Sequence, residues 1–127
     1  MYLLDTHLVL WLAYEPARLS AFAVGVLTDR NHVVAFSLTT IWEVAIKTSL
    51  RRPGFAVDPL RLRTGLLAQG FIELGLKPEH LARVAELPWH HRDPFDRLLV
   101  AQAQHERWLL LTSDKALSAY GPAVQSV

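Results

Sequence analysis

The sequence contains no cysteine, which excludes disulfide bonds, cysteine-based zinc sites and cysteine nucleophiles. It also lacks an apolar run approaching the ~20 residues that are needed to cross a bilayer. The first residues include an acid, Asp5, and lack the basic region that opens a secretory signal. We therefore expect a cytoplasmic protein with no membrane segment, in which any bound metal is held without thiolates.

A strong net charge is absent as well. Thirteen Lys and Arg residues face twelve Asp and Glu residues, so the formal net charge is +1. This balance argues against binding of nucleic acid through bulk charge, although local patches stay open. A charged fraction of 20% and a hydrophobic fraction of 51% argue against disorder. The length of 127 residues predicts one domain, residues 1–127.

Short apolar runs alternate with segments of helical periodicity along the chain. The patterns predict strands at 2–4, 32–36, 71–74, 108–112 and 123–127. They predict helices at 7–14, 19–27, 38–50, 59–69, 79–87 and 95–106, and a short final helix that begins at Ser113-Asp114. Strands that alternate with helices are typical of an α/β fold with a mostly parallel central sheet.

Four acidic residues lie close to the expected strand ends. Asp5 follows the first strand, Asp114 follows the strand 108–112, and Asp96 lies in the first turn of the helix before that strand. Glu43 interrupts an apolar segment of the helix after the second strand. Since the carboxyl ends of parallel strands share one edge of a sheet, these acids can converge there. Converging carboxylates repel unless a cation neutralises them, and Mg²⁺ and Mn²⁺ prefer such oxygen ligands.

Each acid also has a simpler interpretation. Asp93 before Pro94 is typical of a helix N-cap, and Asp114 fits the same role. Glu43 fits an exposed helix residue that pairs with Lys47 one turn later. The joint placement of the four acids, rather than any one of them, favours a metal site that hydrolyses phosphodiester bonds.

These acids belong to an ordered set of motifs. The set comprises Leu3-Leu4-Asp5-Thr6-His7, the segment 37–47 with Trp42-Glu43, the segment 91–103 with Arg92-Asp93-Pro94-Phe95-Asp96-Arg97, and Leu110-Leu111-Thr112-Ser113-Asp114. In this order, over almost the whole chain, the motifs resemble the PIN-domain ribonucleases of the VapC toxin type.

The resemblance implies a single PIN domain, a three-layer α/β/α sandwich, over residues 1–127. It implies a Mg²⁺- or Mn²⁺-dependent endoribonuclease that cleaves RNA as the toxin of a toxin–antitoxin pair. It further implies a protein antitoxin as partner and a homodimer. By the same resemblance Asp5 and Asp96 are the direct metal ligands, while Glu43 and Asp114 complete the acidic cluster through water or by orienting the nucleophilic water.

Further candidates surround these motifs. Asp93, Thr112, Ser113, Arg92 and Arg97 are expected near the acids, where an arginine could orient a carboxylate or contact the scissile phosphate. The scattered histidines favour surface or capping roles, with His7 and His91 at the rim of the site. The densest basic stretch is either a solvated face or a groove for RNA phosphates; its members are Arg51, Arg52, Arg61 and Arg63.

Two other functions fit part of the sequence. The first is a catalytically silent binding or regulatory module with the PIN fold, whose partner surface would lie on the helices around 22–27 and 41–50. The second is a phosphatase with Asp5 as covalent nucleophile, but that family resembles Asp-x-Asp, and position 7 is His. The binding module would require no metal, and the phosphatase would require Asp at position 7.

Overall fold

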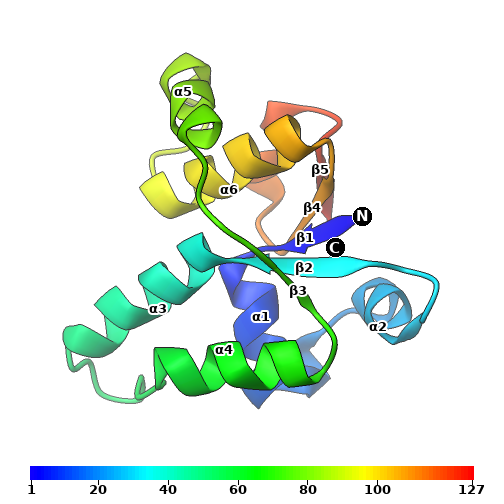
Figure 1. Cartoon of the computed structure of the whole chain (residues 1–127), viewed down its shortest axis with the longest axis vertical. Helices are drawn as coiled ribbons and strands as arrows, with labels where there is room; N and C mark the ends of the chain where they lie inside the picture. Colours follow the sequence, from blue (N-terminus) through cyan, green and yellow to red (C-terminus); the bar gives the residue numbers. More distant parts are fainter.

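The computed structural model describes all residues, 1–127, and forms one five-stranded parallel sheet (Figure 1). The strands are β1 (Tyr2–Leu4), β2 (Val34–Ser37), β3 (Ile72–Leu74), β4 (Leu109–Thr112) and β5 (Val124–Ser126). Their order across the sheet is β3-β2-β1-β4-β5, and every neighbouring pair is parallel. The expected α/β class and parallel sheet are confirmed. The first strand has its predicted bounds, while the other four predicted strands are one or two residues longer than those observed, and β2 ends one residue later than predicted.

Six α-helices and two short 3-10 helices connect the strands. The α-helices are α1 (Thr6–Tyr14), α2 (Ala21–Thr28), α3 (Leu38–Ser49), α4 (Pro59–Ala68), α5 (Pro78–Glu86) and α6 (Pro94–Glu106). The 3-10 helices are η1 (Pro16–Arg18) and η2 (Lys115–Tyr120), so the final short helix is a 3-10 helix. None of the helices has the length and apolar character required to span a membrane.

Helices cover both faces of the sheet and give it three layers (Figure 1). Successive strand residues point to opposite faces, so Leu3 enters the core with α6 and η2, while Leu4 enters the core with α1 and α3. Leu110 and Leu111 of β4 divide between the two cores in the same way. The central strands β1 and β4 are therefore buried on both faces, as their continuous apolar runs predict.

The sheet has a switch point beside its first strand. From β1 the chain passes through β2 and β3 on one side, and β4 and β5 then fill the other side. In open parallel sheets the crevice outside the strand ends at such a point is the usual ligand site. Here the strands beside it are β1 and β4, paired from Tyr2 with Leu109 to Leu4 with Leu111. Asp5 and the segment after Thr112 therefore leave the sheet next to each other.

Candidate active site

Asp5 is fixed at the carboxyl end of β1 by three hydrogen bonds. Its Oδ1 accepts the N–H of Leu8 at 2.8 Å and so caps α1. Its Oδ2 accepts the hydroxyl of Thr112 at 2.6 Å and the N–H of Ser113 at 3.2 Å. Burial raises the pKa of Asp5, and these hydrogen bonds, with Thr112 first, oppose that rise. Thr112 and Ser113 thus contact the acidic cluster through Asp5, at the place the sequence predicts.

Glu43 is buried in α3 and receives two donors. The hydroxyl of Thr6 donates to its Oε1 at 2.7 Å, and the Nζ of Lys47 lies 2.7 Å from its Oε2. The expected pair with Lys47 is therefore present, but Glu43 is not an exposed helix residue. Thr6 also lies 3.1 Å from the hydroxyl of Thr40. Thr6 is not among the predicted site residues, although a hydroxyl directly after the strand-end acid is a usable signal.

Asp96 is the least compensated carboxylate of the group. Its pKa is raised to about 7, first by burial and then by the charges of Asp93, Glu43 and Asp5, while His91 opposes the rise. Its oxygens accept no hydrogen bond from the protein, and the Nε2 of His91 lies 3.7 Å away. Three acids from separate segments therefore share one electrostatic environment, as their places beside the strand ends and in the helices predict.

His91 links Asp96 to Asp114. Its Nε2 lies 2.9 Å from Oδ2 of Asp114, whose Oδ1 accepts the N–H of Ala116 and caps η2. His91, Asp96 and Asp114 offer potential ligand atoms that all lie within 4.8 Å of one another. Asp114 is thus both a cap and a member of the cluster. The expectation that His91 lies at the rim understates its place, since it contacts two of the four acids.

Residues 2–121 match the family model described as PIN domain. The chain belongs to the PIN-domain family. It is 29% identical to Ribonuclease VapC22 of Mycobacterium tuberculosis (strain ATCC 25618 / H37Rv) over 119 residues, which cover 93% of this chain and 90% of that protein. The expected family is therefore confirmed.

Solved structures have the same fold. The chain is similar to VapBC2 from Rickettsia felis bound to a DNA fragment from their promoter, with a TM-score of 0.73 and 15% identity over 99% of this chain and 98% of that one. A toxin-antitoxin complex from Klebsiella pneumoniae gives a TM-score of 0.68 and 22% identity over 99% and 97%. FitAcB from Neisseria gonorrhoeae gives 0.61 and 22% over 98% and 96%. At these identities the likeness establishes the fold, and it confirms the predicted PIN-like sandwich.

In this PIN domain Asp93 is a helix cap. Its Oδ1 accepts the N–H groups of Phe95 at 2.8 Å and Asp96 at 3.3 Å, at the start of α6. Its own N–H donates to Nδ1 of His91 at 3.1 Å. Asp93 therefore positions both Asp96 and His91, and its charge is the largest carboxylate contribution to the raised pKa of Asp96.

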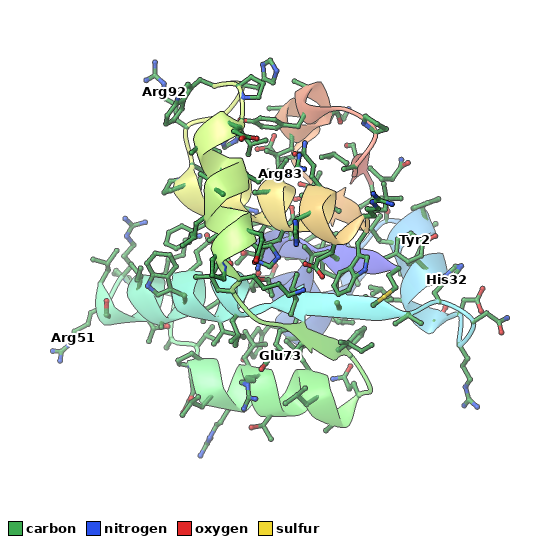
Figure 2. The ribbon with its side chains drawn as sticks, turned by 45° about the horizontal axis from the view of Figure 1, so that its top comes forward. Tyr2, His32, Arg51, Glu73, Arg83 and Arg92 are labelled. Carbon is green, nitrogen blue, oxygen red and sulfur yellow. The ribbon has the colours of Figure 1, made fainter.

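Two arginines expected near the acids of the PIN domain lie elsewhere. Arg97 is buried, and its guanidinium donates to the carbonyls of Pro88, Leu87 and Val84 and to the Tyr120 hydroxyl. Contrary to the expectation, it holds the loop before α6 and not a carboxylate. Arg92 is exposed and projects from that loop (Figure 2).

The basic stretch divides into separate environments. Arg63 forms an ion pair with Glu73, and Arg61, with a side chain that is 90% exposed, lies 3.9 Å from Asp58. Arg51 is exposed beyond the end of α3 (Figure 2). Arg52 lines a cavity of about 550 Å³ between α1 and the segment after α3. The four arginines therefore do not form one continuous groove.

A second group of potential ligands lies at the end of α6. Glu106 is paired with the Nζ of Lys77 at 2.8 Å and with Nε2 of His80 at 2.9 Å, and His105 lies nearby. The Nδ1 of His80 accepts the N–H of Lys77, which places the proton of the neutral ring on Nε2. His80 is thus a buried cap at the start of α5, and its other ring nitrogen contacts Glu106 of the ion-pair cluster.

Proposed function

We propose that this protein is a Mg²⁺- or Mn²⁺-dependent endoribonuclease that cleaves RNA phosphodiester bonds and acts as a cytoplasmic toxin. The observation that carries the proposal is the gathering of Asp5, Glu43 and Asp96 from three segments, with the pKa of Asp96 raised to about 7. Such a cluster is electrostatically incomplete without a cation. Membership of the PIN family and the relative named Ribonuclease VapC22 support the choice of reaction.

The donor set fits a hard divalent ion. Every carboxylate offers oxygen, the ligand type that Mg²⁺ and Mn²⁺ prefer, and no thiolate competes. Asp5 and Asp96 would hold the ion directly, with Glu43 and Asp114 acting through water or orienting the attacking water. When bound, the ion supplies positive charge for the scissile phosphate and lowers the pKa of its bound water.

The protein's own contribution is preorganisation. Thr112 and Ser113 hold Asp5 in place, and Thr6 and Lys47 hold Glu43 from two sides. His91 and the cap on η2 fix both oxygens of Asp114. These hydrogen bonds keep the carboxylates in one geometry despite their mutual repulsion, which spares the reaction the cost of reorganising them.

The proposed partners follow from the proposed function as a toxin ribonuclease. RNA is the substrate, a protein antitoxin silences the enzyme, and the active form is a homodimer. Toxin–antitoxin complexes among the similar structures support the antitoxin. Co-expression with the small protein encoded next to this one should yield a stable complex that suppresses cleavage. Light scattering of the free protein at micromolar concentration should give the mass of a dimer, and a monomer would contradict that part.

Cleavage of RNA by the purified protein tests the central activity. We expect cleavage with Mg²⁺ or Mn²⁺, loss of cleavage in EDTA, and loss in Asp5→Asn, which keeps the volume but removes the ligand charge. Asp29→Asn is the matched control, because Asp29 lies in an exposed turn away from the cluster. Cleavage that survives both EDTA and Asp5→Asn would refute the proposal. RNA binding without metal uptake or cleavage would instead favour a silent binding module.

A further inference from the structure

A hollow of the molecule adjoins the acidic cluster without containing its four acids. This cavity, about 550 Å³, lies between α1, the end of α3 and the segment 52–57. We call it the α1–α3 groove. Its lining includes Lys47, which is paired with Glu43, and His7, which lies close enough to Asp5 to lower its pKa. The groove therefore begins at the site where the proposed reaction takes place.

One face of α1 forms a wall of this groove. His7, Trp11 and Tyr14 all line it, and their spacing of four and three residues places them on the same side of the helix. At a rise of about 1.5 Å per residue, the wall extends about 10 Å from the acidic end to Tyr14. A chain whose reacting bond lies at the acids can therefore continue along this wall.

The groove carries one unpaired cation. Lys47 is neutralised by Glu43, and Arg18 lies 3.0 Å from Glu15. Arg52 also lines the groove, and no carboxylate lies within ion-pair distance of it. Because Lys47 and Arg18 are each paired with a glutamate, Arg52 gives the lining a net positive charge that is complementary to an anion. A phosphate suits the guanidinium of Arg52 because it can accept two parallel hydrogen bonds.

The same groove offers an aromatic surface. The guanidinium of Arg18 covers Trp11 at 4.6 Å from the ring centroid, while Tyr14 is 54% exposed. The groove thus contains an exposed ring, Tyr14, and an unpaired arginine, Arg52. Proteins that bind single-stranded nucleic acid combine aromatic rings, on which bases stack, with basic residues that contact the phosphate backbone. A base within a duplex could not reach such a ring, because its faces are already stacked.

We propose that the α1–α3 groove is a subsite for single-stranded RNA flanking the scissile bond, with a phosphate held by Arg52 and a base stacked on Tyr14. This inference rests on the proposed ribonuclease function and adds the place of the subsite and the residues that hold the RNA there. Arg52 is thus the member of the basic stretch that serves RNA.

Binding in EDTA tests the subsite without cleavage. The probe is a fluorescein-labelled, randomised single-stranded RNA of about 10 nucleotides, followed by anisotropy over a series of salt concentrations. Arg52→Gln should weaken binding and reduce the salt slope by about 0.7, the value for one phosphate contact on a single strand. Tyr14→Ala should weaken binding about fivefold or more, and Tyr14→Phe should restore it. Arg83→Gln, which removes the same charge from α5, should leave both affinity and slope unchanged.

Three results would overturn the subsite. The first is wild-type affinity and salt slope in Arg52→Gln and Tyr14→Ala. The second is equal binding of a duplex RNA with equal losses in both variants. The third is unchanged RNA binding together with weaker binding of a co-expressed protein partner, which would make the groove a protein-docking surface.

Cleavage of the same RNA with Mn²⁺ separates the two proposals. Wild-type protein that binds through Arg52 and Tyr14 but never cleaves would refute the nuclease function and keep the subsite. Wild-type protein that cleaves, with KM and kcat unchanged in both variants, would refute the subsite and keep the nuclease function. The subsite predicts a raised KM with kcat nearly unchanged in Arg52→Gln.

Discussion

The Nε2 atom of His91 lies 2.9 Å from an oxygen of Asp114. The other ring nitrogen, Nδ1, accepts the N–H of Asp93, so the proton of the neutral ring is on Nε2 and donates to the Asp114 carboxylate. A backbone amide of the α6 cap thereby orients a side chain that orients an acid of the site. This chain of contacts joins the start of α6 to the start of η2.

The contact between His91 and Asp114 should matter for catalysis. His91→Ala removes the donor, so we expect activity to fall about tenfold or more, as for other groups that orient metal-binding carboxylates. His91→Gln places an amide donor at similar reach and should restore part of the activity. Steady-state RNA cleavage checks both variants, with Mn²⁺ titration beside it. Equal activity in His91→Ala and wild type would show that Asp114 needs no such support.

Asp96 should make the metal-free protein less stable as pH rises. Its pKa of about 7 in the folded state exceeds the ordinary 3.8, so the folded state binds more protons in the window between these values. Stability therefore falls as pH rises from about 4 to about 7, because the unfolded state gives up this proton first. Asp96→Asn removes this effect, and its Tm in EDTA should exceed that of wild type more at about pH 8 than at about pH 4.

A divalent ion should reverse that instability. Since a ligand that binds only the folded state stabilises it, Mn²⁺ should raise the Tm of wild-type protein above pH 7. Asp96→Asn should show little of this rise, whereas Asp29→Asn should behave as wild type. An equal Mn²⁺-induced rise in Asp96→Asn and wild type would exclude Asp96 as a ligand.

Thr6 should be required to hold Glu43. Thr6→Val keeps the shape but removes the hydroxyl that donates to Oε1 of Glu43 at 2.7 Å. We expect a loss of about 1–3 kcal/mol in the free energy of unfolding, because a buried carboxylate loses a donor. Thr64→Val is the control, since Thr64 is exposed and donates only to a carbonyl of its own helix. Urea unfolding measures both variants, and similar small losses would contradict the assigned role.

Arg97 should act on stability and not directly on chemistry. Its buried guanidinium donates to the carbonyls of Val84, Leu87 and Pro88 and to the Tyr120 hydroxyl, so Arg97→Ala removes four hydrogen bonds and the packing of a buried side chain. We expect a loss of about 3 kcal/mol or more in the free energy of unfolding. Arg83→Ala, at an exposed position of α5, should cost far less. A stable Arg97→Ala protein that had lost only kcat would place Arg97 back at the acids.

The fold is largely predictable from the sequence, because the apolar runs match the buried strands and the turn and cap residues match the ends of the helices. The apolar run of β4 is buried on both faces, and the Asp-Pro pairs at 58–59 and 93–94 start α4 and α6. Strand ends were less predictable: His32 and Val33 precede β2 although their side chains suit a strand. The ends of a strand depend on which of its backbone groups pair with a neighbouring strand, and this pairing joins residues that are far apart in the sequence.

The site was predictable where residue type and position coincide. Asp5 directly follows β1 and Asp114 follows β4 after one residue, so the topology of a parallel sheet brings them to one edge. The direction of a long side chain is not encoded in this way. Arg97 is one residue from Asp96, but its guanidinium reaches the carbonyls of the preceding loop. The sequence indicates only a position at the rim for His91, because its contact with Asp114 depends on how the loop before α6 folds over η2.

The most direct test measures Mn²⁺ binding and RNA cleavage on the same preparation. We predict that cleavage appears over the Mn²⁺ range in which calorimetry detects binding. We also predict that Asp5→Asn and Asp96→Asn lose both signals, while Asp29→Asn keeps both. RNA cleavage that proceeds without detectable Mn²⁺ or Mg²⁺ binding, or Mn²⁺ binding that is unchanged in Asp5→Asn and Asp96→Asn, would contradict the claim that these acids form the catalytic metal site.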